Sequence, residues 1–214
     1  MITNENVLDE LLAVIRAAVN ARSLPEGLRS KLKQKLDAVE TRNTALVLER
    51  EGEIPKNAYY VVKGYVTIIG YDEELNEYVS RLYGPGTIVA QRCFMYQRLS
   101  RYTVIASKRA LVWAVSAGVM NEIYEELPGM REIALQVSDH YEDRKRRARE
   151  LLISLNLEQR VLMFYKRNVL LLPAVRSVVC DEAVASYLGL PKYQLKRKRT
   201  KLICKGILKV PARW

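Results

Sequence analysis

Ten consecutive positions near the C-terminus concentrate residue types that bind anions. The stretch KYQLKRKRTK, residues 192–201, holds six Lys or Arg and no Asp or Glu. A guanidinium can donate two parallel hydrogen bonds to guanine O6 and N7, and an ammonium can hold a phosphate oxygen. A solvated charged helix usually mixes signs, because i,i+4 pairs of opposite charge stabilise it. The stretch therefore predicts binding to double-stranded DNA; the alternative is a basic surface that only aids solubility.

The residues before this stretch predict two short helices joined by a tight turn. Asp181 and Glu182 place negative charge where a helix N-terminus favours it. Gly189 can take the positive φ of a helix C-terminus, and Pro191 suits the first position of the next helix. Leu190 between them is expected to fill the turn. This is a helix-turn-helix, the unit that inserts its second helix into the DNA major groove.

The second helix is expected to present two different faces. Leu195 and Leu202 are one heptad apart and predict the buried face. The residues expected to contact DNA are Lys192, Tyr193, Gln194, Lys196, Arg197, Thr200 and Lys201. Arg197 is expected to select a base and the lysines to hold phosphates. The following KGILKV predicts a short β-wing containing Ile207, Leu208 and Val210, so that a winged helix-turn-helix occupies residues 156–214.

The charge distribution agrees with this reading. The chain has 214 residues and a formal net charge of +11. Residues 156–214 hold 13 Lys or Arg and 3 Asp or Glu, whereas residues 1–155 hold 22 and 21. This asymmetry is typical of a polyanion-binding module attached to a nearly neutral one.

The first half of the chain predicts helices followed by strands. Residues 7 to about 40 are helical in pattern, in two segments divided by SLPEG. From Ala45 to Ser116, short β-branched and aromatic runs alternate with glycines, which predicts an antiparallel barrel or roll. Eight of the 13 tyrosines fall between Tyr59 and Tyr102. Half-buried strand faces explain them better than an aromatic ligand pocket does.

A long helix is expected over residues 128–155. Its apolar seam follows alternating steps of four and three residues, interrupted at Arg144: Met130, Ala134, Val137, Tyr141, Ala148, Leu151 and Leu155. Such a seam either pairs with its copy in a second subunit or packs on its own domain. The length of the helix and its charged flanks favour pairing, and the chain is therefore expected to form a homodimer.

The segment VVCDEAVASYLGLPKYQLKRKR resembles the DNA-binding segment of the Crp/Fnr family of bacterial transcription regulators. In that family an E-x-x-A-x-x-L-G helix precedes a recognition helix containing L-S-R. Here the first pattern is complete from Glu182 to Gly189, while Lys196 replaces the serine of the second. The β-run glycines Gly52, Gly64 and Gly86 also fall where the family's β-roll has its turns.

The resemblance implies an α+β fold with three parts. These are N-terminal helices and an antiparallel, cyclic-nucleotide-binding-like β-roll (1–127), a dimerisation helix (128–155) and a winged helix-turn-helix (156–214). It also implies RNA polymerase as a partner. Because Pro191, Tyr193 and Lys196 depart from the family pattern, no base preference can be transferred.

The resemblance also locates a small-molecule effector site. Relatives that bind cyclic nucleotides use a Gly-Glu pair for the ribose and an Arg-Ser/Thr pair for the phosphate. The matching positions here are Ala90-Gln91 and Arg101-Tyr102, so only the arginine is kept. A neutral amide accepts a hydroxyl proton less strongly than a carboxylate, and cyclic AMP is disfavoured. The roll either binds another small anion near Arg101, which would make this a ligand-gated regulator, responds to a partner, or is only a dimer scaffold.

Other function classes find little support in the sequence. No G-x-S-x-G, H-E-x-x-H or phosphate-binding glycine loop is present, and His140 is the single histidine, so we expect no enzyme and no catalytic residue. Cys93, Cys180 and Cys204 form no metal-binding or disulfide pattern, which predicts neither cofactor nor metal. With no signal peptide or membrane-spanning stretch, a reducing cytoplasm is expected.

Overall fold

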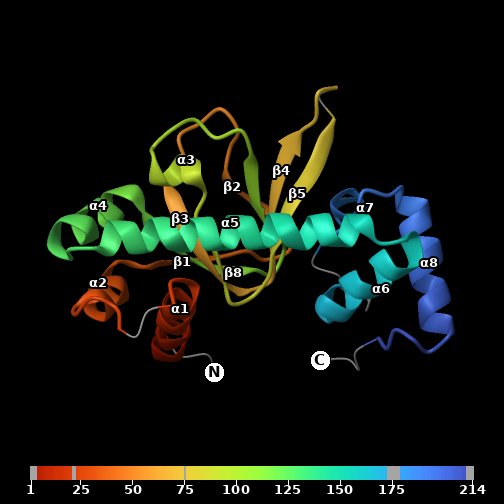
Figure 1. Cartoon of the computed structure of the whole chain (residues 1–214), viewed down its shortest axis with the longest axis horizontal. Helices are drawn as coiled ribbons and strands as arrows, with labels where there is room; N and C mark the ends of the chain where they lie inside the picture. The colour runs from red at the N-terminus through yellow and green to blue at the C-terminus, as the bar shows by residue number, and fades with distance from the viewer. Residues whose placement is uncertain (1–3, 21–22, 75, 173–178, 211–214) are drawn as a thin grey trace.

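The computed structural model describes residues 4–20, 23–74, 76–172 and 179–210. A long helix, α5 (Met130–Ser154), runs along the molecule between a β-roll and a group of C-terminal helices (Figure 1). The α+β fold expected from the sequence is confirmed. Among the described residues, no helix has the length and apolarity needed to cross a membrane.

The β-roll consists of two four-stranded antiparallel sheets. The first has the order β1 (Asp37–Glu40), β8 (Leu111–Ser116), β3 (Asn57–Lys63) and β6 (Thr87–Val89). The second has the order β2 (Leu46–Glu49), β7 (Thr103–Ala106), β4 (Val66–Tyr71) and β5 (Glu77–Tyr83). A turn at Gly64 joins β3 to β4; its φ is +80°, and a Cβ there would lie 2.7 Å from the Ala110 Cα. This position therefore requires glycine.

One strand lies where the sequence pattern predicted helix. Residues 37–40 form β1, which pairs with β8 from Asp37 opposite Ala114 to Glu40 opposite Leu111. Three of its four side chains are exposed, so the segment lacks the apolar alternation by which strands are recognised. Backbone pairing with β8, more than 70 residues away, decides its conformation.

Four helices complete the roll. They are α1 (Asn4–Ala18) with α2 (Leu28–Lys35), α3 (Arg92–Met95), and α4 (Ala117–Glu126). As predicted, α1 and α2 bury an apolar face, and this face joins one core with the first sheet, α4 and the first half of α5. The buried residues that α1 and α2 contribute are Val7, Leu8, Leu11, Ile15, Leu28 and Leu32.

The apolar seam of α5 is divided between two environments. Met130, Ala134, Val137 and Tyr141 are buried in the core of their own chain. Of the three other seam residues, Ala148 and Leu155 are half-buried and Leu151 is 63% exposed. The first four therefore pack on their own domain and are not available to a second copy, contrary to the expected pairing. The helix periodicity was identified correctly, but a helix that packs on its own domain and a helix that pairs with a second subunit show nearly the same period.

The C-terminal helices form a second core. They are α6 (Leu157–Arg167), a 3₁₀ turn η1 (Val169–Leu171), α7 (Asp181–Leu188) and α8 (Lys192–Cys204). Pro173, expected to lie just beyond α6, falls outside the described residues. The second core also includes Tyr65, Val79 and Leu82 from the roll, so the C-terminal helices rest against the roll. Figure 1 shows α7 beside β5.

The predicted β-wing is absent from the described residues. Residues 205–210 form a turn, a bend and irregular chain instead of a strand. The amides of Ile207 and Leu208 both donate to the Leu202 carbonyl, and Leu208 is buried. The segment therefore caps the end of α8 and covers the core, because its backbone donors are used by the helix.

Candidate nucleic-acid interface

The turn between α7 and α8 has the conformation that its sequence predicts. Gly189 is left-handed, with φ 62° and ψ 43°, and its amide donates to the Ser186 carbonyl. The Leu190 amide donates to the Ala185 carbonyl, and the Leu190 side chain is buried. Pro191 stands one position before the predicted place, as the N-cap of α8. Together these contacts fix the direction in which α8 leaves the turn.

Helix α8 separates a buried from an exposed face. Leu195 and Leu202 are fully buried, whereas Tyr193 is 66% exposed. The other predicted DNA contacts are also accessible: Lys192, Lys196, Arg197, Thr200 and Lys201 are exposed and Gln194 is half-buried. The structure thus brings all seven predicted residues onto one helix, with the aromatic and cationic side chains outward.

Arg199 differs from the other cations of α8, because it is only 7% exposed. Its two terminal nitrogens donate to Asp181 at 2.6 and 3.0 Å, and one of them also donates to the Tyr165 hydroxyl at 2.9 Å. Hydrogen bonding to Arg199 lowers the pKa of Asp181. This buried pair ties α8 to the start of α7 and to α6, so Arg199 supports the interface from inside.

Acidic side chains from α6 and α7 lie beside the remaining lysines. Glu182 pairs with Lys192, and Glu158 lies 3.3 Å from Lys198 and 3.7 Å from Lys201. Lys196 is 3.9 Å from Asp181. Within the described residues, Arg197 has no acidic partner. The sequence did not indicate these ion pairs, since the acids come from distant positions in the chain.

A second arginine, Arg160 of α6, joins the end of α7 to the end of α5. Arg160 donates to the carbonyls of Leu188, Ile153 and Leu155 at 2.9, 2.5 and 3.0 Å. These carbonyls lie at the last residue of α7 and around the end of α5, where no helical amide can reach them. Sequence reasoning did not single out Arg160, because only the fold brings these two helix ends together.

The predicted effector residues are only partly brought together. Gln91 is buried, and its Oε1 accepts from Cys93 Sγ at 3.1 Å and from Ser100 Oγ at 3.3 Å. Ser100 Oγ also donates to the Tyr102 carbonyl at 2.8 Å, which links Gln91 to Tyr102. Arg101 is exposed and forms no hydrogen bond or ion pair with the described residues. The predicted anion clamp at Arg101 thus lies apart from the other two.

The cation that accompanies Gln91 and Tyr102 is Arg81, which the sequence did not indicate. Its guanidinium lies 5.4 Å from the centre of the Tyr102 ring. The Nε of Arg81 and the Nε2 of Gln91 are buried and have no hydrogen-bond partner among the described residues. The neighbouring Glu142 of α5 has a raised pKa because it is buried, although Arg81 acts in the opposite direction. This polar group is a candidate effector site within the roll.

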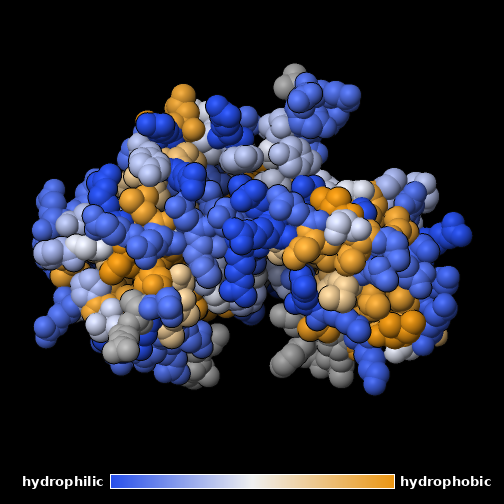
Figure 2. Space-filling model, in the orientation of Figure 1, coloured by the Kyte–Doolittle hydropathy of each residue, from blue (hydrophilic) through white to orange (hydrophobic). Residues whose placement is uncertain are grey.

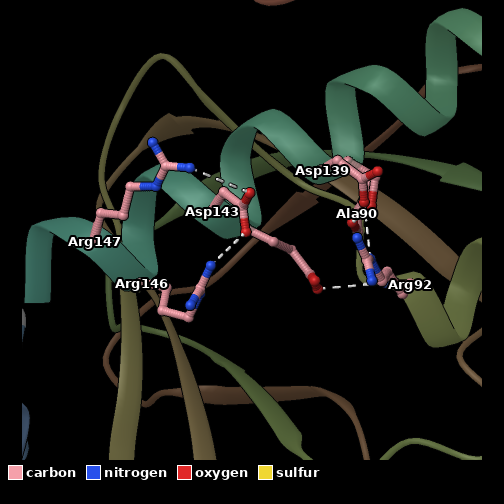
Figure 3. A network of polar contacts seen from close by, with 8 residues as sticks. Ala90, Arg92, Asp139, Asp143, Arg146 and Arg147 are labelled. Atoms are coloured by element: carbon pink, nitrogen blue, oxygen red, sulfur yellow. Dashed lines mark hydrogen bonds and ion pairs between the residues drawn. The ribbon is translucent and has the colours of Figure 1, made fainter. Parts of the chain in front are cut away.

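A network of polar contacts joins the roll to α5 (Figure 3). Arg92 Nε donates to Asp139 at 2.8 Å, and Ser138 Oγ donates to the Ala90 carbonyl at 2.5 Å. The Arg92 amide approaches Glu142 Oε1 at 3.4 Å. The segment that carries Gln91 is therefore bonded on both sides to the helix that leads to the C-terminal core.

A β-roll, a long helix and a helix-turn-helix follow one another along the chain, and known proteins share this arrangement or parts of it. Residues 45–126 match the family described as "Cyclic nucleotide-binding domain". The chain matches none of the curated protein sequences with which it was compared. Three solved structures show the likeness over most of the chain.

FixK2 from Bradyrhizobium japonicum has a TM-score of 0.65 and 17% identity, over 83% of this chain and 89% of that one. A protein from Eubacterium rectale described as a Crp/Fnr family transcriptional regulator has a TM-score of 0.62 and 12% identity, over 88% of each. A CRP family transcriptional regulator from Thermus thermophilus has a TM-score of 0.57 and 17% identity, over 82% of this chain and 88% of that one. The chain therefore has a cyclic nucleotide-binding domain and the fold of the Crp/Fnr transcriptional regulators, which confirms the resemblance seen in the sequence.

Proposed function

We propose that the protein is a sequence-specific regulator of transcription that binds double-stranded DNA as a homodimer. The observation that carries the proposal is the exposed face of α8, where Tyr193, Arg197 and Thr200 follow one another at i, i+4 and i+7. The buried Leu195 and Leu202 hold the opposite face. The excess of positive charge in residues 156–214 supports the same reading.

The residues of α8 divide between phosphate and base contacts. Arg197 has no acidic partner among the described residues, so its guanidinium can bind a guanine edge without breaking an ion pair. Lys196 and Lys201 have weak, exposed pairs at 3.9 and 3.7 Å that DNA phosphates can replace. Each phosphate contact changes the slope of log K against log salt by about 0.9.

Selection of bound duplexes from a random DNA pool tests this proposal. We expect a palindrome whose half-site centres lie about 10–11 base pairs apart. Arg197→Ala is expected to relax the preference at one base pair per half-site, by about 1–3 kcal/mol. The control Lys201→Ala should weaken all duplexes alike and reduce the salt slope by about one. An unchanged site preference in Arg197→Ala would show that another residue selects the base.

The subunit contact is proposed to lie along the exposed side of α5. Its residues follow a heptad-like spacing: Gln136, His140, Asp143, Arg147 and Leu151. Figure 2 shows a hydrophilic band across the middle of the molecule, with hydrophobic surface on either side of it. Leu151 is the apolar residue that a second copy would cover.

Leu151→Glu tests the subunit contact. We expect it to shift the protein from dimer to monomer in light scattering, because a charge would face its own copy across the two-fold axis. Leu99→Glu is the matched control, since Leu99 is 65% exposed and lies on the roll. A Leu151→Glu protein that is as dimeric as the control would place the contact elsewhere.

A second candidate function is ligand gating through the roll, favoured by the unpartnered polar atoms of Arg81 and Gln91. Calorimetric titration with cyclic nucleotides and small anions tests it, and Arg81→Met is expected to abolish any binding. Cyclic AMP is expected not to bind, because Ala90-Gln91 lacks the carboxylate for its ribose. Absence of heat with every compound would indicate a regulator that needs no effector of these classes.

RNA polymerase is a further proposed partner, and the cytoplasm is the proposed location. No catalytic role is proposed.

A further inference from the structure

A cleft of about 690 Å³ lies where the β-roll, α5 and α6 meet. One wall is the turn between β5 and β6 at Pro85, Gly86 and Thr87, and the opposite wall is the second half of α5 at Arg144 and Lys145. Clefts that bind small molecules in proteins usually measure about 300–1,000 Å³. The size of this cleft is therefore suited to a small molecule.

The cleft is lined by cations without matching acids. Arg144, Lys145 and Arg167 line it, and no Asp or Glu is among its described lining residues. None of the three forms an ion pair with a described residue. Arg147, on the same stretch of α5, does not line the cleft and approaches Asp143 at 3.9 Å (Figure 3). The unpaired positive charges thus converge on one place.

Lys145 is the most confined of the three cations. It is half-buried, and its ammonium lies 5.3 Å from the centre of the Tyr83 ring. Burial, with a smaller effect from Arg144, lowers the pKa of Lys145 to about 8. The other titratable groups lining the cleft are Arg167 and the hydroxyls of Tyr141 and Tyr187. None of these supplies the negative charge that a desolvated ammonium requires.

We infer that this cleft binds an organic phosphate carrying two or more negative charges, held by Arg144, Lys145 and Arg167. Three converging cations match a diphosphate better than a single carboxylate. Leu82, Leu152 and Tyr187 supply apolar surface for the rest of the molecule. Because the lining residues come from the roll, α5, α6 and α7, the bound molecule would fix the C-terminal helices against the roll.

The site is separate from the two already described. Arg81, Gln91 and Tyr102, which form the polar group inside the roll, do not line the cleft. No residue of α8 lines it, so DNA bound by α8 is not its occupant. Binding is therefore measured on the full chain without DNA, and a negative result leaves the DNA-binding proposal unaffected.

Calorimetric titration with inorganic pyrophosphate and with ADP tests the inference. We expect saturable binding of one molecule per chain, at least as tight for ADP as for pyrophosphate. Lys145→Met is expected to weaken both by tenfold or more while folding normally, because it replaces a confined charge with an apolar chain of similar shape. Lys166→Met is the matched control: Lys166 is an exposed neighbour of Arg167, does not line the cleft, and carries the same charge.

A spectroscopic readout accompanies the titration. In protein with ¹³C-methylated lysines, the resonance that is missing from Lys145→Met is expected to titrate near pH 8 and to shift to higher pH when pyrophosphate is added. The inference is overturned if neither compound binds saturably, if Lys166→Met weakens binding as much as Lys145→Met, or if the Lys145 titration does not move. It is also overturned if Lys145→Met weakens binding of every duplex in the absence of pyrophosphate, which would assign the cleft to DNA phosphates.

Discussion

Asp181 holds helix α8 in place through a single arginine, Arg199. Its two oxygens accept from Arg199 at 2.6 and 3.0 Å, and Arg199 is bonded to Tyr165 on its other side. Removing one partner of a largely buried pair leaves the other charge uncompensated, which costs more than the loss of an exposed pair. The orientation of the exposed residues on α8 therefore depends on Asp181, which is not among the residues proposed to contact DNA.

Asp181→Asn is expected to lower the free energy of unfolding by about 2 kcal/mol at pH 7. Because Arg199 lowers the pKa of Asp181 below its ordinary value of 3.8, this stability is present above about pH 4 and is lost as the pH falls through the lowered pKa. Urea unfolding of both proteins between pH 7 and pH 3 measures the difference, which should shrink below pH 4.

Glu182→Gln provides the control, because Glu182 is the next residue and its pair with Lys192 is exposed. We expect a much smaller effect from it at every pH. Equal effects of the two substitutions would mean that general charge at the start of α7, and not the pair with Arg199, stabilises the motif.

The residues that the sequence identified correctly are those whose roles are local. Gly189, Leu195 and Leu202 are recognisable from spacing within one helix or one turn. Arg199 was counted among the cations of residues 192–201 but was given no role, because its partners lie 18 and 34 positions away. Arg81 was missed for the same reason, since only the folded roll places it over Tyr102.

At the scale of elements, the turn between α7 and α8 depends on one backbone conformation. Gly189 has a φ of +62°, while a Cβ there would meet no atom closer than Arg160 Nη1 at 4.0 Å. The space for a methyl group is present, so the requirement for glycine is conformational. The cost of another residue is the strain of the left-handed region alone.

Gly189→Ala is expected to destabilise the protein by about 1 kcal/mol. Gly118→Ala, near the start of α4, is a control of opposite sign. Gly118 is exposed and helical, so alanine there should be neutral or stabilise by up to about 1 kcal/mol. Denaturant unfolding of the two variants gives both values. A neutral Gly189→Ala would show that the turn can adopt another conformation without loss.

The elements that the sequence predicted less well are those whose packing is decided at long range. The seam of α5 was recognised, yet Met130, Ala134, Val137 and Tyr141 pack on the roll, because periodicity does not specify which surface covers it. The wing expected at Ile207 is replaced by a cap on α8. The packing of α5 depends on which neighbour covers its apolar face, and the conformation at Ile207 depends on which group its backbone amide bonds.

At the scale of the whole molecule, the position of α8 is determined by how the C-terminal helices rest on the roll. The Val79 amide donates to Ser186 Oγ at 2.9 Å, which joins β5 to α7. Arg149 of α5 donates to the Tyr187 carbonyl at 3.0 Å, and its guanidinium lies within 6 Å of the Tyr78 and Tyr187 rings. We therefore expect a change in the roll or in α5 to reach the face of α8 proposed to bind DNA through this junction.

Arg149→Met is expected to separate the unfolding of the two cores. Tyr65, Val79 and Leu82 of the roll belong to the C-terminal core, so the intact junction should couple the two parts into one calorimetric transition. Without Arg149, the smaller C-terminal part should unfold first, at a lower temperature, and the transition should broaden or divide. Arg146→Met is the control, because Arg146 lies on the same helix and pairs with Asp143 and Glu150 of α5 itself. If Arg149→Met unfolds in one transition as sharp as that of the control, the apolar contacts alone hold the junction. Any coupling between the roll and α8 would then have to run through α5 itself.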